Sequence, residues 1–292
     1  MKALATLALL LALPAFAQEP AQAPARLDSI TWLSGEAAEP GAKPFAQVLV
    51  GFLQARWPEV RHTVIQANAR RSWQMVGSGE HACQVSSVRT PEREKLAFFT
   101  DTLIGPPQQL IVRRDKAALL PRNAAGEVEL ARLLTDERLR GALVDGRSYG
   151  DLIDAQLEKL PPQHNAQLVR YASSDFGSRI LPMLGRDRAD YTIGYDVSLS
   201  RPAPDGGPLP SVGLMSVPIA GASASVRAGV ACPRNAWGLA AIQHIDKLLA
   251  TPAGVAMLRE ETERWLTPET RQRYGARLDE FYRERARPSV IR

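Results

Sequence analysis

The chain has 292 residues, of which 45% are hydrophobic and 23% are charged, with a formal net charge of +5. This composition is that of a globular protein and excludes an intrinsically disordered chain. The arginines and lysines are scattered among acidic residues, without a basic run or interleaved aromatic residues, so nucleic-acid binding is not supported. The length exceeds what one small core needs and predicts two lobes.

The first 17 residues have the pattern of an export signal. Lys2 gives a basic start, Ala3 to Leu13 is apolar with one polar residue, and Ala15-Phe16-Ala17 places small residues where a signal peptidase cleaves. We therefore expect cleavage after Ala17, a flexible leader over 18–25, and a mature protein in the periplasm. The apolar run is too short to span a bilayer, and no later segment is long and apolar enough to do so.

From residue 26 onward, strand-like and helix-like segments alternate along the chain. Strands are expected over 29–33, 62–66, 82–88, 110–112, 142–144, 168–171, 191–195 and 225–231. Helices are expected over 44–57, 70–76, 129–139, 149–160, 174–184 and 237–250, with a helical, highly charged tail over 251–292. The alternation predicts an α/β protein with mostly parallel sheets, and a restart near Arg113 predicts two such units.

Cys83 and Cys232 are the two cysteines of the chain. In an oxidising compartment an isolated pair favours a disulfide, and two buried free thiols are the alternative. Neither cysteine has Cys or His neighbours at metal-binding spacing, so no metal site is predicted. The sequence also lacks the common phosphate, zinc and calcium motifs, and no cofactor is expected.

Three further segments of the chain carry distinct motifs, which occur in a fixed order and spacing. The first runs from Gly79-Glu80-His81-Ala82-Cys83 through Thr90-Pro91-Glu92-Arg93 to Phe98-Phe99-Thr100-Asp101. The second joins Gly185-Arg186 to Ala189-Asp190, and the third is Val230-Ala231-Cys232-Pro233 before the helix at Trp237. In this order and spacing they resemble the family 3 extracellular solute-binding proteins of bacterial ABC uptake systems. The resemblance is to a divergent branch of the amino-acid binders and runs through nearly the whole mature chain.

This resemblance implies a hinged pair of α/β lobes joined by two crossovers. Lobe one would hold residues 26–112 and 227–292, and lobe two residues 113–226. The ligand would lie between the lobes, at the carboxyl ends of the strands, and closure would present a new surface to a transporter. The two cysteines would both lie in lobe one, on adjacent strands.

Arg93 is the first candidate for ligand binding. It matches the arginine that holds the α-carboxylate in amino-acid binders of this family, and a guanidinium grips a carboxylate with two parallel bonds. Thr90 would add a hydroxyl group or cap the turn. The alternative is a surface ion pair of Arg93 with Glu92 or Asp101.

The second lobe offers Ser148 and Tyr149 at a predicted helix start, where backbone N–H groups suit an anion. The alternative for Ser148 is a plain helix cap. Tyr195 or Asp196 falls where the family places an acid for the ligand's ammonium group, although the register is displaced by one residue. Trp32 and Glu36 follow the first strand and are expected on the other wall, with Trp32 equally suited to the core.

One enzyme alternative exists. Gly146-Arg147-Ser148-Tyr149-Gly150 spells Gly-x-Ser-x-Gly, and Asp196 and His244 follow in the order of α/β-hydrolases. Against a secreted serine hydrolase, no oxyanion segment precedes the motif and His244 falls within a helix. We expect a non-enzymatic binder.

The expected function is binding of a small anionic or zwitterionic solute for ABC-type uptake. A periplasmic sensor or interaction module of the same fold stays open. The partners would be a small-molecule ligand and an inner-membrane ABC permease or a membrane sensor, with the protein itself a monomer.

Overall fold

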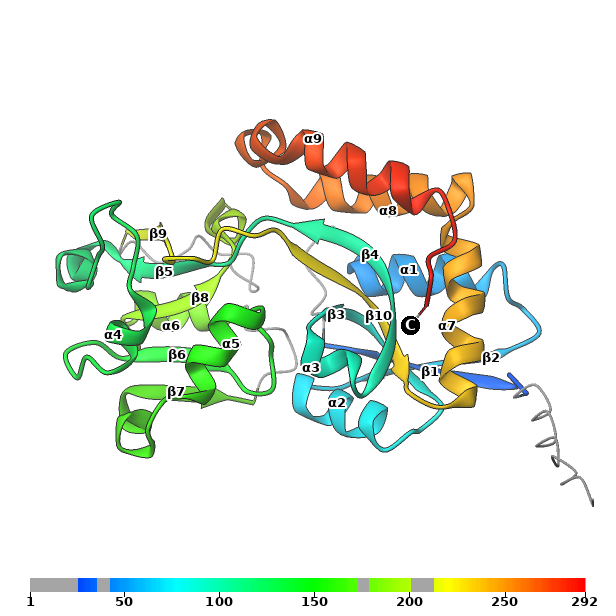
Figure 1. The fold of residues 1–292 in the computed structure, drawn as a ribbon, viewed down its shortest axis with the longest axis horizontal. Coiled ribbons are helices and arrows are strands. Elements are labelled where there is room, and N and C mark those ends of the chain that lie inside the picture. Colours follow the sequence, from blue (N-terminus) through cyan, green and yellow to red (C-terminus); the bar gives the residue numbers. More distant parts are fainter. Residues whose placement is uncertain (1–25, 36–42, 173–178, 201–212, 292) are drawn as a thin grey trace, which may run out of the picture.

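The chain forms two lobes side by side, each built on a five-stranded sheet (Figure 1). The structure is a computed structural model that describes residues 26–35, 43–172, 179–200 and 213–291. The predicted signal peptide and leader, residues 1–25, lie outside the described residues. No helix in the described ranges is both long and apolar enough to cross a membrane.

Lobe one has the strand order β2-β1-β3-β10-β4. Its strands are β1 (Ser29–Ser34), β2 (Arg61–Gln66), β3 (Ala82–Val88), β4 (Ala97–Gly105) and β10 (Val226–Pro233). Its helices are α1 (Phe45–Gln54), α2 (Ala69–Gly77), α3 (Pro91–Glu94), α7 (Ala236–Leu249), α8 (Pro252–Trp265) and α9 (Pro268–Arg285).

Lobe two has the strand order β7-β6-β8-β5-β9. Its strands are β5 (Gln109–Arg113), β6 (Gly141–Val144), β7 (Leu168–Tyr171), β8 (Tyr191–Gly194) and β9 (Leu214–Pro218). Its helices are α4 (Leu130–Leu134), α5 (Asp151–Glu158) and α6 (Ile180–Gly185), with 3-10 turns over Arg114–Leu119, Pro162–Gln167 and Asp196–Ser200.

The predicted two-lobed α/β fold is confirmed, but both sheets are mixed rather than mostly parallel. In lobe one, β1 is parallel to β2 and β3, whereas β10 is antiparallel to β3 and β4. In lobe two, β6 is parallel to β7 and β8, whereas β5 is antiparallel to β8 and β9. The antiparallel strand of each sheet follows a crossover: β10 returns the chain to lobe one between β3 and β4, and β5 brings it into lobe two between β8 and β9.

The lobes are joined by two crossovers, residues 106–108 between β4 and β5 and residues 219–225 between β9 and β10. The predicted boundary after residue 112 is therefore wrong, since β5 hydrogen-bonds to β8 and β9 of lobe two. The second boundary falls where β10 begins, at Val226.

Side-chain caps set the starts of the helices that carry or frame the site. The side chains of Asn68, Thr90, Asn235, Thr251 and Thr267 each accept a hydrogen bond from a backbone N–H in the first turn. Such caps satisfy donors that the helix itself leaves unpaired. Thr267 and Pro268 also explain why the predicted helical tail is two helices, because they begin α9 directly after α8 ends.

Cys83 of β3 and Cys232 of β10 form the predicted disulfide, with their Cα atoms 4.3 Å apart. Both residues are fully buried in the core of lobe one. The bond ties the returning segment of the chain to the N-terminal segment within one lobe. It therefore fastens lobe one without crossing to lobe two.

Candidate functional site

Arg93 lies at the boundary between the lobes and bonds to both of them. Thr90 caps α3 by accepting from the Arg93 backbone N–H at 3.2 Å. Nη1 of Arg93 donates to Ser87 Oγ and to the Val88 carbonyl, both at 3.1 Å, within lobe one. Nη2 donates to the carbonyl oxygen of Gly146, in lobe two, at 3.1 Å. Nη1 of the guanidinium thus bonds within lobe one, and Nη2 bonds to lobe two.

The Arg93 guanidinium also packs over the Trp73 ring of α2, 4.6 Å from the ring centroid. Burial lowers its pKa to about 10, an effect opposed by the charge of Asp154 and reinforced by that of Arg147. Arg93 therefore remains a cation at neutral pH, but one whose charge is poorly solvated.

The predicted alternative, a surface ion pair of Arg93, does not form. Glu92 pairs instead with Lys95 at 2.6 Å, and Asp101 pairs with Arg89 at 3.3 Å and Arg227 at 3.4 Å. Within the described ranges, no carboxylate forms an ion pair with Arg93. A half-buried cation held only by neutral acceptors is a suitable site for an anion.

Gly146 makes a close approach between the lobes. Its φ is +70°, and a Cβ atom at this position would lie 2.8 Å from the backbone nitrogen of Arg70 and 2.9 Å from its Cα. The neighbouring Asp145 pairs with Arg70 across the same boundary at 3.4 Å. The Asp145–Gly146 turn therefore contacts both α2 and Arg93, and only glycine fits there.

Ser148 and Tyr149 both have partners inside lobe two. Ser148 Oγ donates to the Asp154 carboxylate and accepts from the Gly150 N–H at 3.1 Å. The Tyr149 N–H donates to Asp154 at 2.8 Å, and its hydroxyl accepts from the Val144 N–H at 2.9 Å. A protein carboxylate thus already occupies the turn where an anion was expected. The alternative of a plain cap is not met either, because Gly150 is the N-cap residue of α5 and no side chain caps this helix.

The charges around the start of α5 also oppose an anion there. Burial raises the pKa of Asp151, and the neighbouring carboxylates of Asp154, Glu94 and Glu92 raise it further. A further negative charge at this helix start would add to the same repulsion. Arg93 of lobe one is the desolvated cation of the boundary, and the charge of Arg147 of lobe two acts on it.

The residues proposed for a serine-hydrolase triad are not brought together. The hydroxyl of Ser148 bonds to Asp154, and Asp196 accepts from the Val197 N–H at 2.8 Å. His244 lies on α7, on the side of lobe one away from lobe two (Figure 1), and stacks on Trp57 with ring centroids 4.2 Å apart. The Gly-x-Ser-x-Gly pattern is part of a turn in lobe two.

Tyr195 and Asp196 follow β8 and are half-buried. The Tyr195 ring meets Trp265 of lobe one edge-on at 5.0 Å, and burial raises the pKa of its hydroxyl. Trp32 is fully buried and donates from Nε1 to His62 at 2.9 Å. Trp32 is therefore a core residue, and its placement on the cleft wall is wrong. Glu36 lies outside the described residues.

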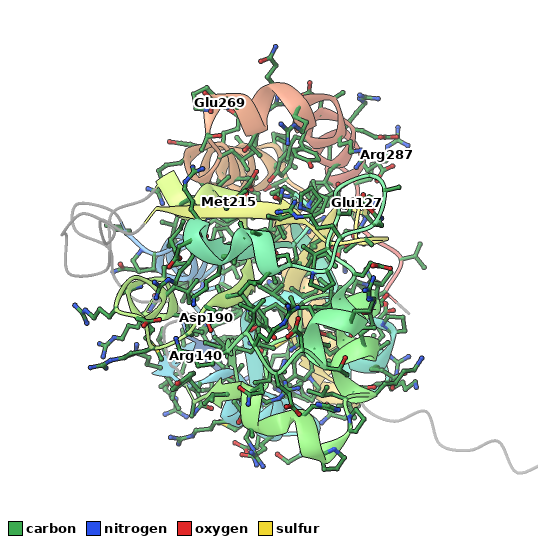
Figure 2. All side chains as sticks on the ribbon, turned by 90° about the vertical axis from the view of Figure 1, so that its left-hand side faces the viewer. Glu127, Arg140, Asp190, Met215, Glu269 and Arg287 are labelled. Carbon is green, nitrogen blue, oxygen red and sulfur yellow. A yellow bond between two sulfur atoms is a disulfide. The ribbon has the colours of Figure 1, made fainter. Side chains whose placement is uncertain are left out.

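Asp190, which carries part of the family-like pattern, lies at the opposite end of lobe two from the boundary. It accepts from the Arg140 N–H at 2.8 Å and from Arg140 Nε at 3.1 Å, just before β6 and β8 begin (Figure 2). Burial opposes its ionisation, but the bonds and charge of Arg140 outweigh burial and hold the Asp190 pKa below its usual range. This pair therefore has a structural role in lobe two.

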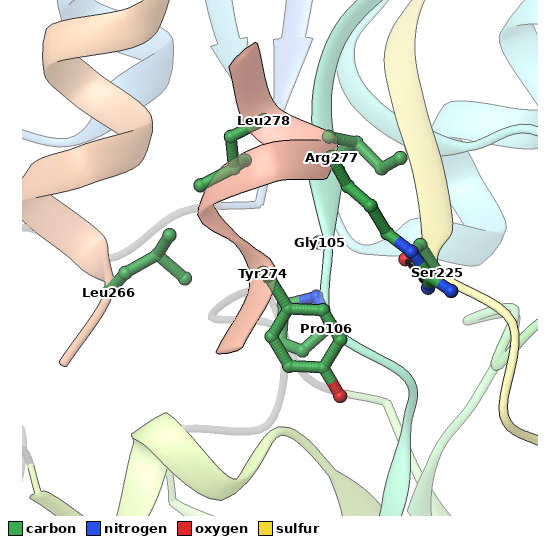
Figure 3. Close-up of a pocket in the computed structure, with 8 residues that line it drawn as sticks. Gly105, Pro106, Ser225, Leu266, Tyr274, Arg277 and Leu278 are labelled. Carbon is green, nitrogen blue, oxygen red and sulfur yellow. Dashed lines mark hydrogen bonds between the residues drawn. The ribbon is translucent and has the colours of Figure 1, made fainter. Parts of the chain in front are cut away.

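A small pocket lies beside the crossovers (Figure 3). It is lined by Ile104, Gly105, Pro106, Ser225, Leu266, Tyr274, Arg277 and Leu278. Arg277 donates to Ser225 at 3.0 Å and so ties α9 to the segment before β10. The lining is mostly apolar, and its arginine already has a protein partner, so this pocket is not a polar ligand site.

Several residues of the boundary could not be identified from the sequence. Trp73 and Ser87 contact Arg93 but belong to an ordinary helix face and strand pattern. Gly146 had the signal of an Asp-Gly turn, which predicts a turn but not what the turn touches. No group of three or more metal-binding side chains occurs in the described part of the chain.

Comparison with known proteins shows similarity in fold. No protein family matches the sequence, and no curated protein matches it. A solved structure described as an L-cystine ABC transporter of Listeria monocytogenes is 14% identical with a TM-score of 0.59, covering 83% of this chain and 97% of that one.

Two other solved structures are similar to the same extent. A mutant of ArgBP from T. maritima is 16% identical with a TM-score of 0.57, covering 82% of this chain and 95% of that one. A histidine kinase sensor domain similar to periplasmic binding proteins is 16% identical with a TM-score of 0.57, covering 83% and 97%. The chain therefore has the two-lobed fold of the periplasmic binding proteins.

Proposed function

We propose that this protein binds a small anionic or zwitterionic solute between its lobes in the periplasm, with Arg93 as the carboxylate clamp. The observation that carries the proposal is the state of Arg93: it is a desolvated cation at the lobe boundary, held by neutral acceptors. A ligand carboxylate would supply the missing charge and accept two parallel bonds from the guanidinium.

The geometry supports a particular mode of binding. Nη1 is fixed by Ser87 and Val88, and the Trp73 ring supports the guanidinium plane. Nη2 donates to a main-chain carbonyl, which is a weaker acceptor than a carboxylate. The ligand would take the place of the Gly146 carbonyl on Nη2, and Tyr195 and Asp196 after β8 would meet its far end.

Similar structures support an amino-acid-like ligand. One is described as an ancestral arginine-binding protein bound to arginine, and another as the same kind of protein bound to glutamine. The similar structures include one described as an ABC transporter protein and one described as a kinase sensor domain. This fold therefore occurs in both transport and sensing. Co-purification with a permease would assign the protein to uptake, and co-purification with a membrane sensor would assign it to signalling.

A thermal-shift screen of residues 18–292 tests the proposal. The probes are L-arginine, L-glutamine, L-cystine, succinate and glycylglycine, each with the wild type, Arg93→Lys and Arg71→Ala. A ligand that binds the folded state at a hundredfold excess over its dissociation constant stabilises it by about 2.7 kcal/mol. We expect a shift in the wild type and in the exposed-surface control Arg71→Ala, and a reduced one in Arg93→Lys, which keeps the charge but loses the fork. A probe that shifts Arg93→Lys as much as the wild type contradicts the clamp.

A further inference from the structure

Gln108 lies in the first crossover between the lobes and has only 2% of its surface exposed. Both polar atoms of its side chain, Nε2 and Oε1, are buried, and neither has a hydrogen-bond partner among the described residues. Burial of a carboxamide in this way costs free energy, because its bonds to water are lost without replacement. An unpaired buried amide in a native protein therefore calls for a reason.

The position of Gln108 supplies that reason. The next residue, Gln109, pairs with Gly194 at the end of β8 and with Pro218 at the end of β9. β8 is parallel to β6, so both strands end at this edge, which faces lobe one (Figure 1). Open α/β sheets bind their ligands at the carboxyl ends of such strands. Gln108 is thus placed at the ligand-binding edge of lobe two.

Strand alternation puts Gln108 on the face of the sheet that carries Leu110 and Val112. Tyr149 and Ile153 pack in the same core, so the start of α5 covers this face. α5 begins at Asp151, a few residues after Gly146, whose carbonyl accepts from Arg93. The amide therefore lies at the edge of an apolar face covered by the helix that follows this turn.

We propose that Gln108 contacts the ligand and selects solutes that carry a primary carboxamide. A primary carboxamide has a donor and an acceptor side by side, so a second primary carboxamide pairs with it through two hydrogen bonds. A carboxylate would satisfy Nε2 but place an acceptor against Oε1. The inference rests on the proposed function, in which Arg93 holds the ligand's carboxylate, and it names the chemistry of the rest of the ligand.

Isothermal titration tests the selection with two matched pairs of probes, L-glutamine with L-glutamate and L-asparagine with L-aspartate. The proteins are the wild type, Gln108→Met, and the control Gln109→Met, which removes the adjacent amide from the opposite face. We expect the wild type and the control to prefer an amide over its acid by at least tenfold. Gln108→Met loses this preference and gains thermal stability, because methionine has a similar volume and leaves no polar atom unpaired.

A second variant, Gln108→Asn, tests the inference in case Gln108→Met does not fold. Gln108→Asn keeps the amide but holds it one methylene group further from the ligand. We expect this variant also to lose the preference for an amide over its acid. An equal affinity of the wild type for an amide and its acid, or a preference that survives in both Gln108 variants, overturns the inference and leaves the proposed function intact. If the wild type binds none of these probes and none of the thermal-shift probes, the proposed function fails, and this inference fails with it.

Discussion

Nη2 of Arg93 lies 3.1 Å from the carbonyl oxygen of Gly146, and this hydrogen bond joins lobe one to lobe two. The same donor is the one that a ligand carboxylate would use. In the proposed function, a ligand carboxylate and the Asp145–Gly146 turn would therefore compete for one guanidinium edge. Binding is favoured to the extent that a charged acceptor outweighs a neutral one.

Gly146→Ala is expected to separate the lobes. Its Cβ atom would lie 2.8 Å from the Arg70 backbone nitrogen, which cannot move without displacing α2. Small-angle scattering of residues 18–292 should show a larger radius of gyration than that of the wild type. Gly126→Ala is the matched control, since Gly126 has a φ of +80° but nothing within 4 Å of the added Cβ atom. An equal radius for the two variants would show that the turn does not set the lobe spacing.

The strand and helix pattern of this chain could be predicted well from the sequence, with specific exceptions. β4 was missed because its centre is polar, Thr100-Asp101-Thr102, although all three residues are buried. Thr100 is tolerated there because it donates to Asp246, which in turn pairs with Arg285 at 3.0 Å. These partners lie far away in the sequence and leave no local signal. β9 was missed because it has a serine at its centre and ends at a proline.

Some residues of the candidate site could likewise be predicted from the sequence, and others could not. Arg93 could be found because a motif places it after a strand and a capped turn. Its partner Gly146 is 53 residues away and contributes a backbone oxygen, so no side-chain pattern could reveal the contact. Trp32 was misplaced for the opposite reason, since an aromatic residue near a strand end has the same appearance in a core as on a cleft wall. The full burial of Trp32 and its hydrogen bond to His62 show that it belongs to the core.

Loss of the disulfide should destabilise the protein strongly. Cys83 and Cys232 are separated by 149 residues, so the bond removes much conformational freedom from the unfolded chain. Removal of such a native disulfide costs about 2–5 kcal/mol. Urea unfolding of the Cys83→Ser/Cys232→Ser double variant should show a lower midpoint than the oxidised wild type. A reduced wild type that unfolds at the same midpoint as the oxidised form would contradict this expectation.

The Asp190–Arg140 pair should contribute to stability in a pH-dependent way. The folded-state pKa of Asp190 is lowered, so the folded protein binds fewer protons than the unfolded chain. This contribution is fully present above the unfolded pKa of about 3.9 and is lost as pH falls through the folded value. Urea unfolding between pH 7 and pH 3 should show a smaller acid-induced loss of stability for Asp190→Asn. Identical pH profiles for the two proteins would exclude a role for this carboxylate.

The central claim is that Arg93 holds the ligand's carboxylate, and a double-mutant cycle across the ligand tests it most directly. L-Arginine and L-argininamide, or the acid and amide of whichever probe binds best, are titrated into the wild type and Arg93→Ala. Loss of the carboxylate should weaken binding to the wild type at least tenfold, equivalent to about 1.4 kcal/mol, and should have little further effect on Arg93→Ala. An acid-to-amide ratio that is the same in both proteins would contradict the claim and place the carboxylate elsewhere.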